Sequence, residues 1–293
     1  MLIDSFLKYL QLEKAYSDKT IVSYRNDLIQ FEMFFKEIDE NLDYLVVDAD
    51  IIRMWIISLM DQKYTSTSVN RKLSSLRSFY RFLLRKKVVK VNPLLKINGP
   101  KNKKKLPSFL REKDMDRLLD ETSFGEGFAG DRDRLILEMF YETGIRLSEL
   151  IGMNVDDVDF LNLQIKVTGK RNKQRIIPFG QELADDLKTY LRQRNETCST
   201  GEEALFILEN GKRMYPDSVY KIVKRNLSRV VSLKKRSPHV LRHTFATSML
   251  NGQADLESVK ELLGHQSLTT TEIYTHTTFE ELKKVYKQAH PRA

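Results

Sequence analysis

The chain has 293 residues, of which 41% are hydrophobic and 30% are charged, and this balance excludes an intrinsically disordered protein. The 49 Lys and Arg residues outnumber the 40 Asp and Glu residues, so the formal net charge is +9, which suits a polyanionic partner such as nucleic acid. The single cysteine, Cys198, excludes an internal disulfide and indicates a reducing compartment.

The first residues predict an amphipathic helix, because the apolar residues Leu2, Phe6 and Leu10 are separated by charged ones such as Asp4 and Lys8. These charges exclude the uninterrupted apolar core of a secretory signal. No apolar run in the chain approaches the length of a membrane span. We therefore expect a cytoplasmic protein that has no contact with a membrane.

Residues 1–95 predict a small all-α domain. Helical periodicity indicates two helices within residues 2–37, a third at about 48–61, and a fourth from Ser66 to about Lys87. Ser17 is expected to cap the second helix. Since no strand-like alternation appears here, the domain should consist of four helices.

The fourth helix is unusually basic. Between Gln62 and Lys90 there are nine Lys or Arg residues and no acidic residue. A solvated helix face usually mixes the two signs, so this one is expected to bind phosphates, with a plain solvated face as the alternative. The predicted DNA contacts on it are Arg71, Lys72 and Arg77.

Residues 96–107 predict a basic linker between two domains. They contain Asn98-Gly99-Pro100 and the run Lys101-Asn102-Lys103-Lys104-Lys105, and they show no regular periodicity. The linker is either a flexible connection or a segment that lies along a DNA backbone, and the two are compatible. In the second case Lys103 contacts DNA.

Residues 108–293 predict a second, α-rich domain. Helices are expected at Arg111–Glu121 and Asp131–Thr143, and another begins after Gly144. Alternating apolar residues on both sides of a turn at 168–173 predict a β-hairpin, and helices are expected almost throughout from Leu183 to the end. Asp156, Asp157 and Asp159 follow a helix and precede a strand, so they are interpreted as a polar turn and not as a magnesium site.

The five histidines all lie at or after position 239. This part of the chain also contains an arginine and a tyrosine of interest, and the candidate site residues in it are, in order, His239, Arg242, His265 and Tyr274. A tyrosine side chain has a pKa of about 10, so only about one in a thousand is ionised at pH 7, a shortfall of roughly 4 kcal/mol. A nucleophilic tyrosine therefore needs cations beside the phosphate that it attacks.

Several residues of this chain are suited to that task. Arg146 and Arg242 carry fixed charges in a forked geometry that matches the non-bridging oxygens of a phosphodiester. His239 and His265 supply imidazoles. Lys170, expected at the tip of the hairpin, is placed to protonate the leaving sugar oxygen. The resulting tyrosyl ester would conserve the bond energy, so rejoining the strand needs no ATP.

Five separated motifs, in this order and at these spacings, resemble those of the tyrosine site-specific recombinases of the phage integrase family. The motifs are Gly144-Ile-Arg-Leu-Ser-Glu-Leu150, Thr168-Gly-Lys170 with Asn172-Lys173, His239-Val-Leu-Arg242-His-Thr-Phe-Ala246, Leu262-Leu-Gly-His265 and Tyr274-Thr-His276. The final His290-Pro-Arg-Ala293, and the lack of a further N-terminal domain, resemble the Xer subgroup.

The resemblance implies a fold and a set of roles. The fold is mainly α with a small β-sheet, in which an N-terminal four-helix core-binding domain of the SAM-like type precedes the catalytic domain. Arg146, Lys170, His239, Arg242 and His265 are implied to activate the phosphate and Tyr274 to be the nucleophile, while Glu149 orients an arginine or an imidazole. Lys173 is a predicted DNA contact and the alternative to Lys170 as the general acid.

The resemblance also implies the reaction and its partners. Duplex DNA is cut and rejoined at a recombination site through a 3′-phosphotyrosine, without metal or cofactor, by a homo- or hetero-tetramer on two sites. An Xer role means the resolution of chromosome or plasmid dimers, which supports chromosome partition at cell division. The alternatives are the integration of a mobile element, a type IB topoisomerase and an inactive DNA-binding protein. Whether a second recombinase or a DNA translocase takes part stays open.

A last helix is predicted at about 279–288, with Thr278 and Glu281 as its capping box. Its apolar stripe, Phe279, Leu282, Val285 and Tyr286, must pack on another surface, because so short a helix is marginal alone. It either folds back on its own domain or, as the family resemblance favours, docks on a neighbouring protomer as an exchange helix.

Other motifs are interpreted as structural. His239 and His243 have the spacing of zinc ligands, but Arg242 between them would place a fixed cation beside the metal, so no metal site is predicted. Gly211-Lys212-Arg213 does not complete a nucleotide-binding loop, because Phe206 stands where the first glycine is required. His276 and His290 are expected at the surface.

Overall fold

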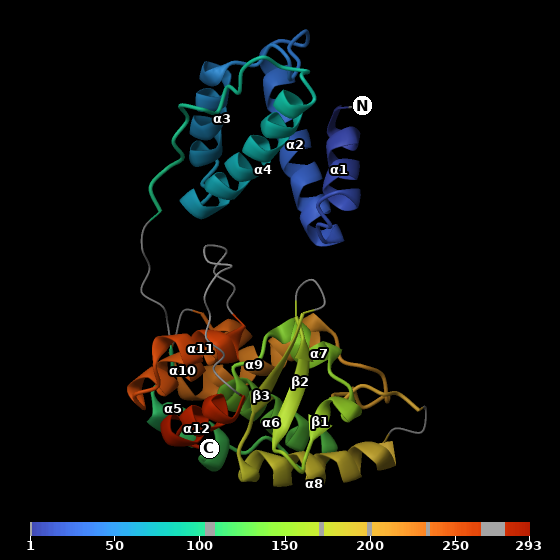
Figure 1. Ribbon diagram of the computed structural model, residues 1–293, viewed down its shortest axis with the longest axis vertical. Coiled ribbons are helices and arrows are strands. Elements are labelled where there is room, and N and C mark those ends of the chain that lie inside the picture. Colours follow the sequence, from blue (N-terminus) through green and yellow to red (C-terminus); the bar gives the residue numbers. More distant parts are fainter. Residues whose placement is uncertain (1, 103–108, 170–172, 198–200, 233–234, 265–278) are drawn as a thin grey trace. The chain divides into compact units, whose positions relative to one another are not determined.

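The computed structural model describes residues 2–102, 109–169, 173–197, 201–232, 235–264 and 279–293. The chain forms two compact units, Met1–Lys105 and Leu106–Ala293, and each is described by itself. Figure 1 shows a helical N-terminal unit and a second unit in which helices surround a small sheet. The predicted fold class, mainly α with a small β-sheet, is confirmed.

The N-terminal unit consists of α1 (Leu2–Leu12), α2 (Asp18–Ile38), α3 (Ala49–Asp61) and α4 (Ser66–Arg85) (Figure 1). Their apolar faces meet in one core, in which Phe6, Leu28, Phe31, Ile52, Trp55, Leu73 and Phe79 are at most 1% exposed. The aromatic rings pack edge to face, which adds to the stabilisation from burial.

The helices of this unit differ in how the backbone N–H groups at their N-termini are capped. Asp48 accepts the backbone N–H groups of Asp50 and Ile51, and Thr65 accepts that of Ser68 at 3.2 Å. Ser17 stands at the N-cap position of α2, as predicted, but its hydroxyl bonds the hydroxyl of Thr20 at 3.0 Å and caps no backbone group. The predicted capping role of Ser17 is wrong.

Part of the predicted linker packs on the N-terminal unit. Ile97 is 4% exposed within its core, and its carbonyl accepts a hydrogen bond from Arg77 at 2.8 Å. Asn70 donates to the carbonyl of Pro100 at 2.8 Å, and a Cβ at Gly99 would lie 1.8 Å from the Asn70 side chain. The segment from 97 to 100 is therefore held against α4.

The second unit begins with α5 (Glu112–Asp116), which continues as the π-helical turn η1 (Arg117–Glu121), and α6 (Phe128–Thr143). After α7 (Leu147–Gly152) and the 3₁₀ turn η2 (Val155–Asp157) comes an antiparallel sheet with strand order β1 (Val158–Asp159), β2 (Gln164–Thr168) and β3 (Gln174–Pro178). Five further helices are described: α8 (Gln181–Thr197), α9 (Pro216–Val230), α10 (Pro238–Asn251), α11 (Leu256–Leu263) and α12 (Phe279–Ala289).

The predicted hairpin is confirmed, with Ile165 paired to Ile177 and Val167 to Arg175. The aspartates before it form the expected polar turn, since Asp157 accepts the N–H of Asn154 at 2.9 Å and Asp159 that of Asn162 at 3.0 Å.

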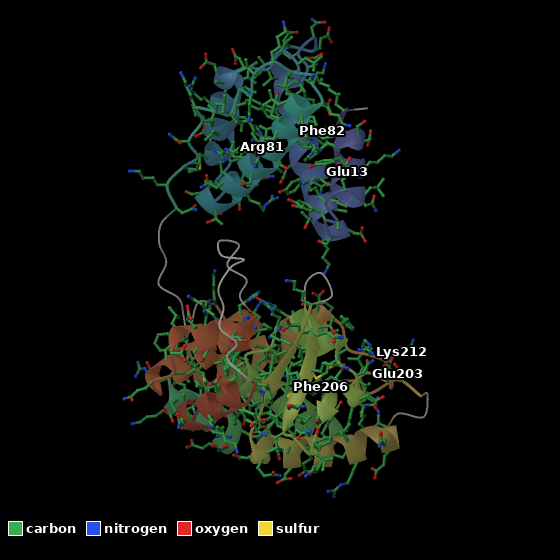
Figure 2. The ribbon with its side chains drawn as sticks, viewed as in Figure 1. Glu13, Arg81, Phe82, Glu203, Phe206 and Lys212 are labelled. Carbon is green, nitrogen blue, oxygen red and sulfur yellow. The ribbon has the colours of Figure 1, made fainter. Side chains whose placement is uncertain are left out.

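The prediction of helices almost throughout from Leu183 is wrong between α8 and α9. Residues 204–207 are a buried apolar run that bends at 205–206, with bridges from Ala204 to Asn154 and from Ile207 to Arg213. Gly211, at φ 74°, allows the turn between them. In Figure 2, Phe206 lies inside the unit, while Glu203 and Lys212 lie at its edge.

The last helix, α12, packs on its own unit. Leu282, Tyr286 and Ala289 are buried against Phe245 and Met249 of α10 and apolar residues of α11. In this chain the apolar stripe is therefore covered by residues of its own unit, and docking of the helix on a neighbouring protomer stays a prediction. Thr278 of the predicted capping box lies outside the described residues.

His290, predicted at the surface, is 5% exposed. Its imidazole stacks on the rings of Tyr286 and Phe245, and its Nε2 lies 3.2 Å from the carbonyl oxygen of Tyr141. The prediction is wrong because His290 follows Tyr286 by four positions and continues the buried stripe of α12. Across the described residues, no helix is both long and apolar enough to cross a membrane.

Candidate active site

Arg146 is fixed by the start of α7. It occupies the N-cap position, where Glu149 accepts its backbone N–H at 2.8 Å through Oε2 and its side-chain NH1 at 2.7 Å through Oε1. Glu149 is 4% exposed, so the carboxylate that orients Arg146 is itself shielded from water. This single residue therefore sets both the backbone and the side chain of Arg146.

Arg242 reaches the same place from α10 and is 9% exposed. Its NH1 donates to the carbonyl of Gly144, just after α6, and its NH2 donates to the carbonyl of Leu263 at 2.5 Å. Gly144 ends α6 at φ 57°, and a Cβ there would lie 2.5 Å from the ring of Phe245. Only glycine fits this position, so the carbonyl that holds Arg242 depends on it.

The C-terminal end of α11 joins these groups. Its last carbonyls carry the negative end of the helix dipole and lack partners within the helix. Leu263 binds Arg242, as described, and the carbonyl of Gly264 accepts NH2 of Arg146 at 2.7 Å. The structure thus brings together Arg146 and Arg242, two residues that the sequence predicted for one site.

Arg175 of β3 is a third guanidinium in this cluster, and the sequence reasoning missed it. Its NH1 and NH2 donate to the two oxygens of Glu149 at 2.7 and 3.0 Å. One signal was available: strand alternation places Arg175 on the same face of β3 as the buried Ile177, where an arginine needs a partner.

The cluster has an excess of positive charge. Burial alone would raise the pKa of Glu149, but the hydrogen bonds and charge of Arg175, and then those of Arg146, lower this pKa to about 2. Burial, and then the neighbouring charges of Arg146 and Arg175, lower the pKa of Arg242 to about 10. Three guanidinium groups thus share one carboxylate, an arrangement that favours the arrival of an anion.

The hairpin loop starts beside this cluster. The N–H of Gly169 donates to the carbonyl of Lys173 at 2.7 Å and closes the loop. A Cβ at Gly169 would lie 3.2 Å from Oε1 of Glu149 and 4.0 Å from NH1 of Arg146. Lys173 is exposed, and Lys170 lies outside the described residues.

His239 lies exposed in the first turn of α10, three positions before Arg242. His265 and Tyr274 lie outside the described residues, as does His276. His243 is exposed as well, and in the part of the chain that the structure describes no three His, Cys, Asp or Glu side chains are grouped to hold a metal ion.

The predicted DNA contacts on α4 have partners inside the N-terminal unit. Lys72 is 7% exposed, and its ammonium group donates to Asp27 at 3.0 Å and to Gln30 at 2.5 Å. The charge of Lys72 is thus paired with a buried carboxylate, which weighs against a contact with DNA, and the predicted contact stays a prediction. Arg71 also binds Asp27, through NH2 at 2.8 Å, but its side chain is 47% exposed. Lys103 lies outside the described residues.

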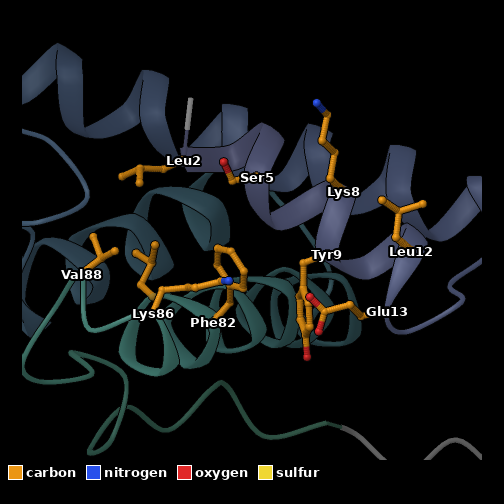
Figure 3. A pocket seen from close by; sticks show the side chains of 10 residues that line it. Leu2, Ser5, Lys8, Tyr9, Leu12, Glu13, Phe82, Lys86 and Val88 are labelled. Carbon is orange, nitrogen blue, oxygen red and sulfur yellow. The ribbon is translucent and has the colours of Figure 1, made fainter.

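A shallow groove in the N-terminal unit lies between α1 and α4 and contains none of the predicted catalytic residues (Figure 3). Tyr9 and Phe82 stack across it with ring centroids 5.1 Å apart, and Leu12 at its edge is 80% exposed. The Arg85 guanidinium covers the Tyr9 ring at 4.0 Å.

Residues 108–281 match the phage integrase family, and residues 3–87 match the N-terminal SAM-like domain of phage integrases. The chain is 39% identical to "Tyrosine recombinase XerC" of Chlorobaculum tepidum, over 99% of this chain and 94% of that protein. It is 37% identical to "Tyrosine recombinase XerD" of Staphylococcus haemolyticus, over 100% of this chain and 99% of that protein.

Among solved structures, that of the XerH site-specific recombinase bound to palindromic difH substrate is similar in fold. The TM-score is 0.73 at 23% identity, and the match covers 96% of this chain and 83% of the other.

Proposed function

This chain belongs to the phage integrase family, and from that premise we propose that it is an Xer-type tyrosine recombinase that cuts and rejoins duplex DNA at a specific site through a 3′-phosphotyrosine on Tyr274. The observation that carries the proposal is the meeting of Arg146 and Arg242 at the end of α11. Both arginines are held by protein carbonyl groups.

The two arginines are proposed to bind the non-bridging oxygens of the scissile phosphate. Negative charge grows on these oxygens during attack by a phenol oxygen, so preorganised cations stabilise the transition state more than the ground state. The loss of one such donor typically costs about 100- to 1,000-fold in rate. Glu149 keeps Arg146 aimed and limits the repulsion among the guanidiniums.

The remaining predicted residues are proposed to transfer the protons of the reaction. His239 and His265 are proposed to take the phenol proton and to donate hydrogen bonds to the phosphate, and Lys170 to protonate the departing 5′ oxygen of the sugar. The position of Gly169 beside Glu149 supports a catalytic residue at the start of this loop. Lys173 is the alternative acid.

The first experiment asks whether Tyr274 forms the ester. The wild-type protein is incubated in excess EDTA with a nicked duplex that carries its recombination site, the nick placed so that cleavage is irreversible. A covalent protein–DNA band is expected from the wild type and none from Tyr274→Phe, while both bind the site with equal affinity. Adduct formation by the phenylalanine variant, or a need for a divalent metal in cleavage, contradicts the proposal.

The second experiment identifies the acid. A 5′-bridging sulfur makes the leaving group a good one that needs no proton. Lys170→Ala should cleave ordinary DNA slowly and the sulfur-containing DNA at close to the wild-type rate, whereas Lys173→Ala should show no such difference. The opposite pattern assigns the acid to Lys173.

The biological role is proposed to be the resolution of chromosome or plasmid dimers in the cytoplasm, by four protomers on two sites. Sequencing of the DNA trapped covalently on the protein in cells tests this role. A single chromosomal site supports dimer resolution, and ends of a mobile element support integration. Light scattering on paired sites, with and without a second recombinase, tests the tetramer and its composition.

A further inference from the structure

We propose that Arg175 is a positioning residue of the recombination reaction, which holds Glu149 and the end of α11 so that Arg146 and Arg242 face the phosphate. The inference rests on the proposed function, since it concerns the same site. Arg175 is 15% exposed at its side chain and is held by three contacts from two separate elements.

The first contact is with α7. Arg175 faces Glu149 fork to fork, NH1 to Oε1 and NH2 to Oε2, which fixes the rotation of the carboxylate as well as its place. Oε1 is shared with NH1 of Arg146, and Oε2 is shared with the Arg146 backbone N–H. A change in the orientation of Glu149 is therefore transmitted to Arg146 at two points.

The second contact is with the end of α11, where Nε of Arg175 donates to the carbonyl of Leu262 at 2.9 Å. Three consecutive carbonyls, those of Leu262, Leu263 and Gly264, thus accept from Arg175, Arg242 and Arg146 respectively. All three nitrogens of Arg175 are engaged by protein acceptors, so its role is to tie β3, α7 and α11 together.

Close packing strengthens this arrangement. Gly264 ends α11 at φ 65°, and a Cβ there would lie 3.1 to 3.2 Å from Cδ, Nε and NH1 of Arg175. The Arg175 side chain therefore lies against the residue whose carbonyl aims Arg146.

A lysine cannot replace this arginine. It keeps the charge but has one nitrogen, which cannot bridge both oxygens of Glu149 and also reach Leu262. Arg175→Lys thus retains the positive charge but loses the forked geometry of the guanidinium group, whereas Arg175→Gln loses both. Arg194 offers a matched control, because it too is a buried arginine of this unit, 5% exposed, that donates to backbone carbonyls, at Ala204 and Glu202.

The test measures covalent adduct formation on the nicked duplex at saturating DNA, together with DNA affinity and melting temperature, in the full chain. Arg175→Gln is expected to cleave about 100-fold more slowly than the wild type, with DNA affinity within about threefold, since small misplacements of reacting groups carry such costs. Arg175→Lys should recover part of the rate. Arg194→Lys should lower the melting temperature at least as much and leave the cleavage rate of the folded protein unchanged.

A double variant shows whether Arg175 acts through Glu149. Glu149→Gln combined with Arg175→Gln should cleave no more slowly than the slower single variant, because each breaks the same link. Wild-type cleavage by Arg175→Gln, a loss confined to DNA affinity, or multiplicative losses in the double variant overturn the inference. If Arg175→Gln melts below the assay temperature, Arg175→Lys is compared with Arg194→Lys in its place, and equal rates overturn the inference. If the wild type forms no adduct, it is the proposed function that fails.

Discussion

The ammonium group of Lys72 lies 3.0 Å from Oδ1 of Asp27, and the two side chains are only 8% and 2% exposed. Ser75 donates to the other oxygen of Asp27 at 3.1 Å, and Arg71 binds both. The carboxylate of Asp27 is thus surrounded by donors that all come from α4. The helix that appeared basic and unpaired in the sequence therefore supplies, with some of its residues, the donors around the buried carboxylate of Asp27.

Lys72→Met should therefore destabilise the protein and leave DNA binding largely unaffected. The loss is expected to be about 1–3 kcal/mol, because Asp27 keeps Arg71 and Ser75 but loses one charged partner. Urea unfolding measures the stability, with the exposed Lys86→Met as the control. The slope of log affinity against log salt should not change, whereas a fall of about one unit with unchanged stability would return Lys72 to the DNA surface.

Gly144→Ala should weaken both stability and cleavage. The left-handed backbone at φ 57° costs an alanine about 1–2 kcal/mol, and its Cβ must displace Phe245 and Leu263. Since the Gly144 carbonyl holds Arg242, the displacement also disturbs the site. Thermal melting and single-turnover cleavage measure the two effects.

The control for that variant is Gly152→Ala, at a position with nothing within 4 Å of the new methyl group and no left-handed backbone. It should be neutral or slightly stabilising. Equal effects of the two substitutions would contradict the role of Gly144.

Glu138→Gln should stabilise the protein increasingly as the pH rises. Burial raises the pKa of Glu138 to about 8, although Arg134 lies 3.6 Å from it and Arg292 lies 4.0 Å away. A carboxyl group whose pKa is raised by folding contributes stability that is present below about pH 4.5 and is lost as the pH rises toward 8. Glutamine does not titrate, so its advantage should be larger at pH 8 than at pH 5.

The measurement is the difference in unfolding free energy between variant and wild type at the two pH values. Glu126→Gln, at an exposed position, is the control variant. Parallel pH profiles for wild type and Glu138→Gln would rule out a proton on Glu138.

The buried His290 should make stability depend on pH in the opposite direction. Burial lowers its pKa to about 4, and the neutral ring donates from Nε2 to the carbonyl of Tyr141 and accepts the N–H of Arg292 at Nδ1, at 3.2 Å. A histidine whose pKa is lowered by folding contributes stability that is present above about pH 6.5 and is lost as the pH falls toward 4. Acid should therefore release the C-terminal segment.

His290→Gln should be less stable than the wild type at pH 7, because it loses a buried ring, and the difference should shrink between pH 6.5 and 4.5. Denaturant unfolding at several pH values checks this, with the exposed His243→Gln as the control. A difference that stays constant with pH would show that His290 keeps its proton state on unfolding.

The sequence predicted what depends on local pattern. Helical periodicity located α1 to α4, and strand alternation located the hairpin. The family resemblance implied that Glu149 orients an arginine or an imidazole, and the structure shows Glu149 paired with Arg146. The sequence did not predict that Arg242 binds the carbonyls of Gly144 and Leu263, because every residue carries a carbonyl and the acceptor leaves no trace in residue type.

Side-chain pairs between distant parts of the sequence were not predicted, for a related reason. Asp27 and Lys72 are 45 positions apart, and Glu149 and Arg175 are 26 apart, so neither pair forms a motif. Only the buried register of each residue pointed to a partner: Asp27 lies one helical turn before the buried Phe31, and Arg175 shares a strand face with Ile177.

The bonds that aim the two proposed catalytic arginines span large distances along the chain. Arg146 is 118 positions from the carbonyl of Gly264, and Arg242 is 98 from that of Gly144. Contacts of such high sequence separation form late, because the intervening chain must first be ordered. On the ribosome, Arg146 cannot find its acceptor until Gly264 has been synthesised and has left the exit tunnel. We therefore expect an unfinished polypeptide to lack an assembled arginine pair and, with it, the proposed cleavage activity.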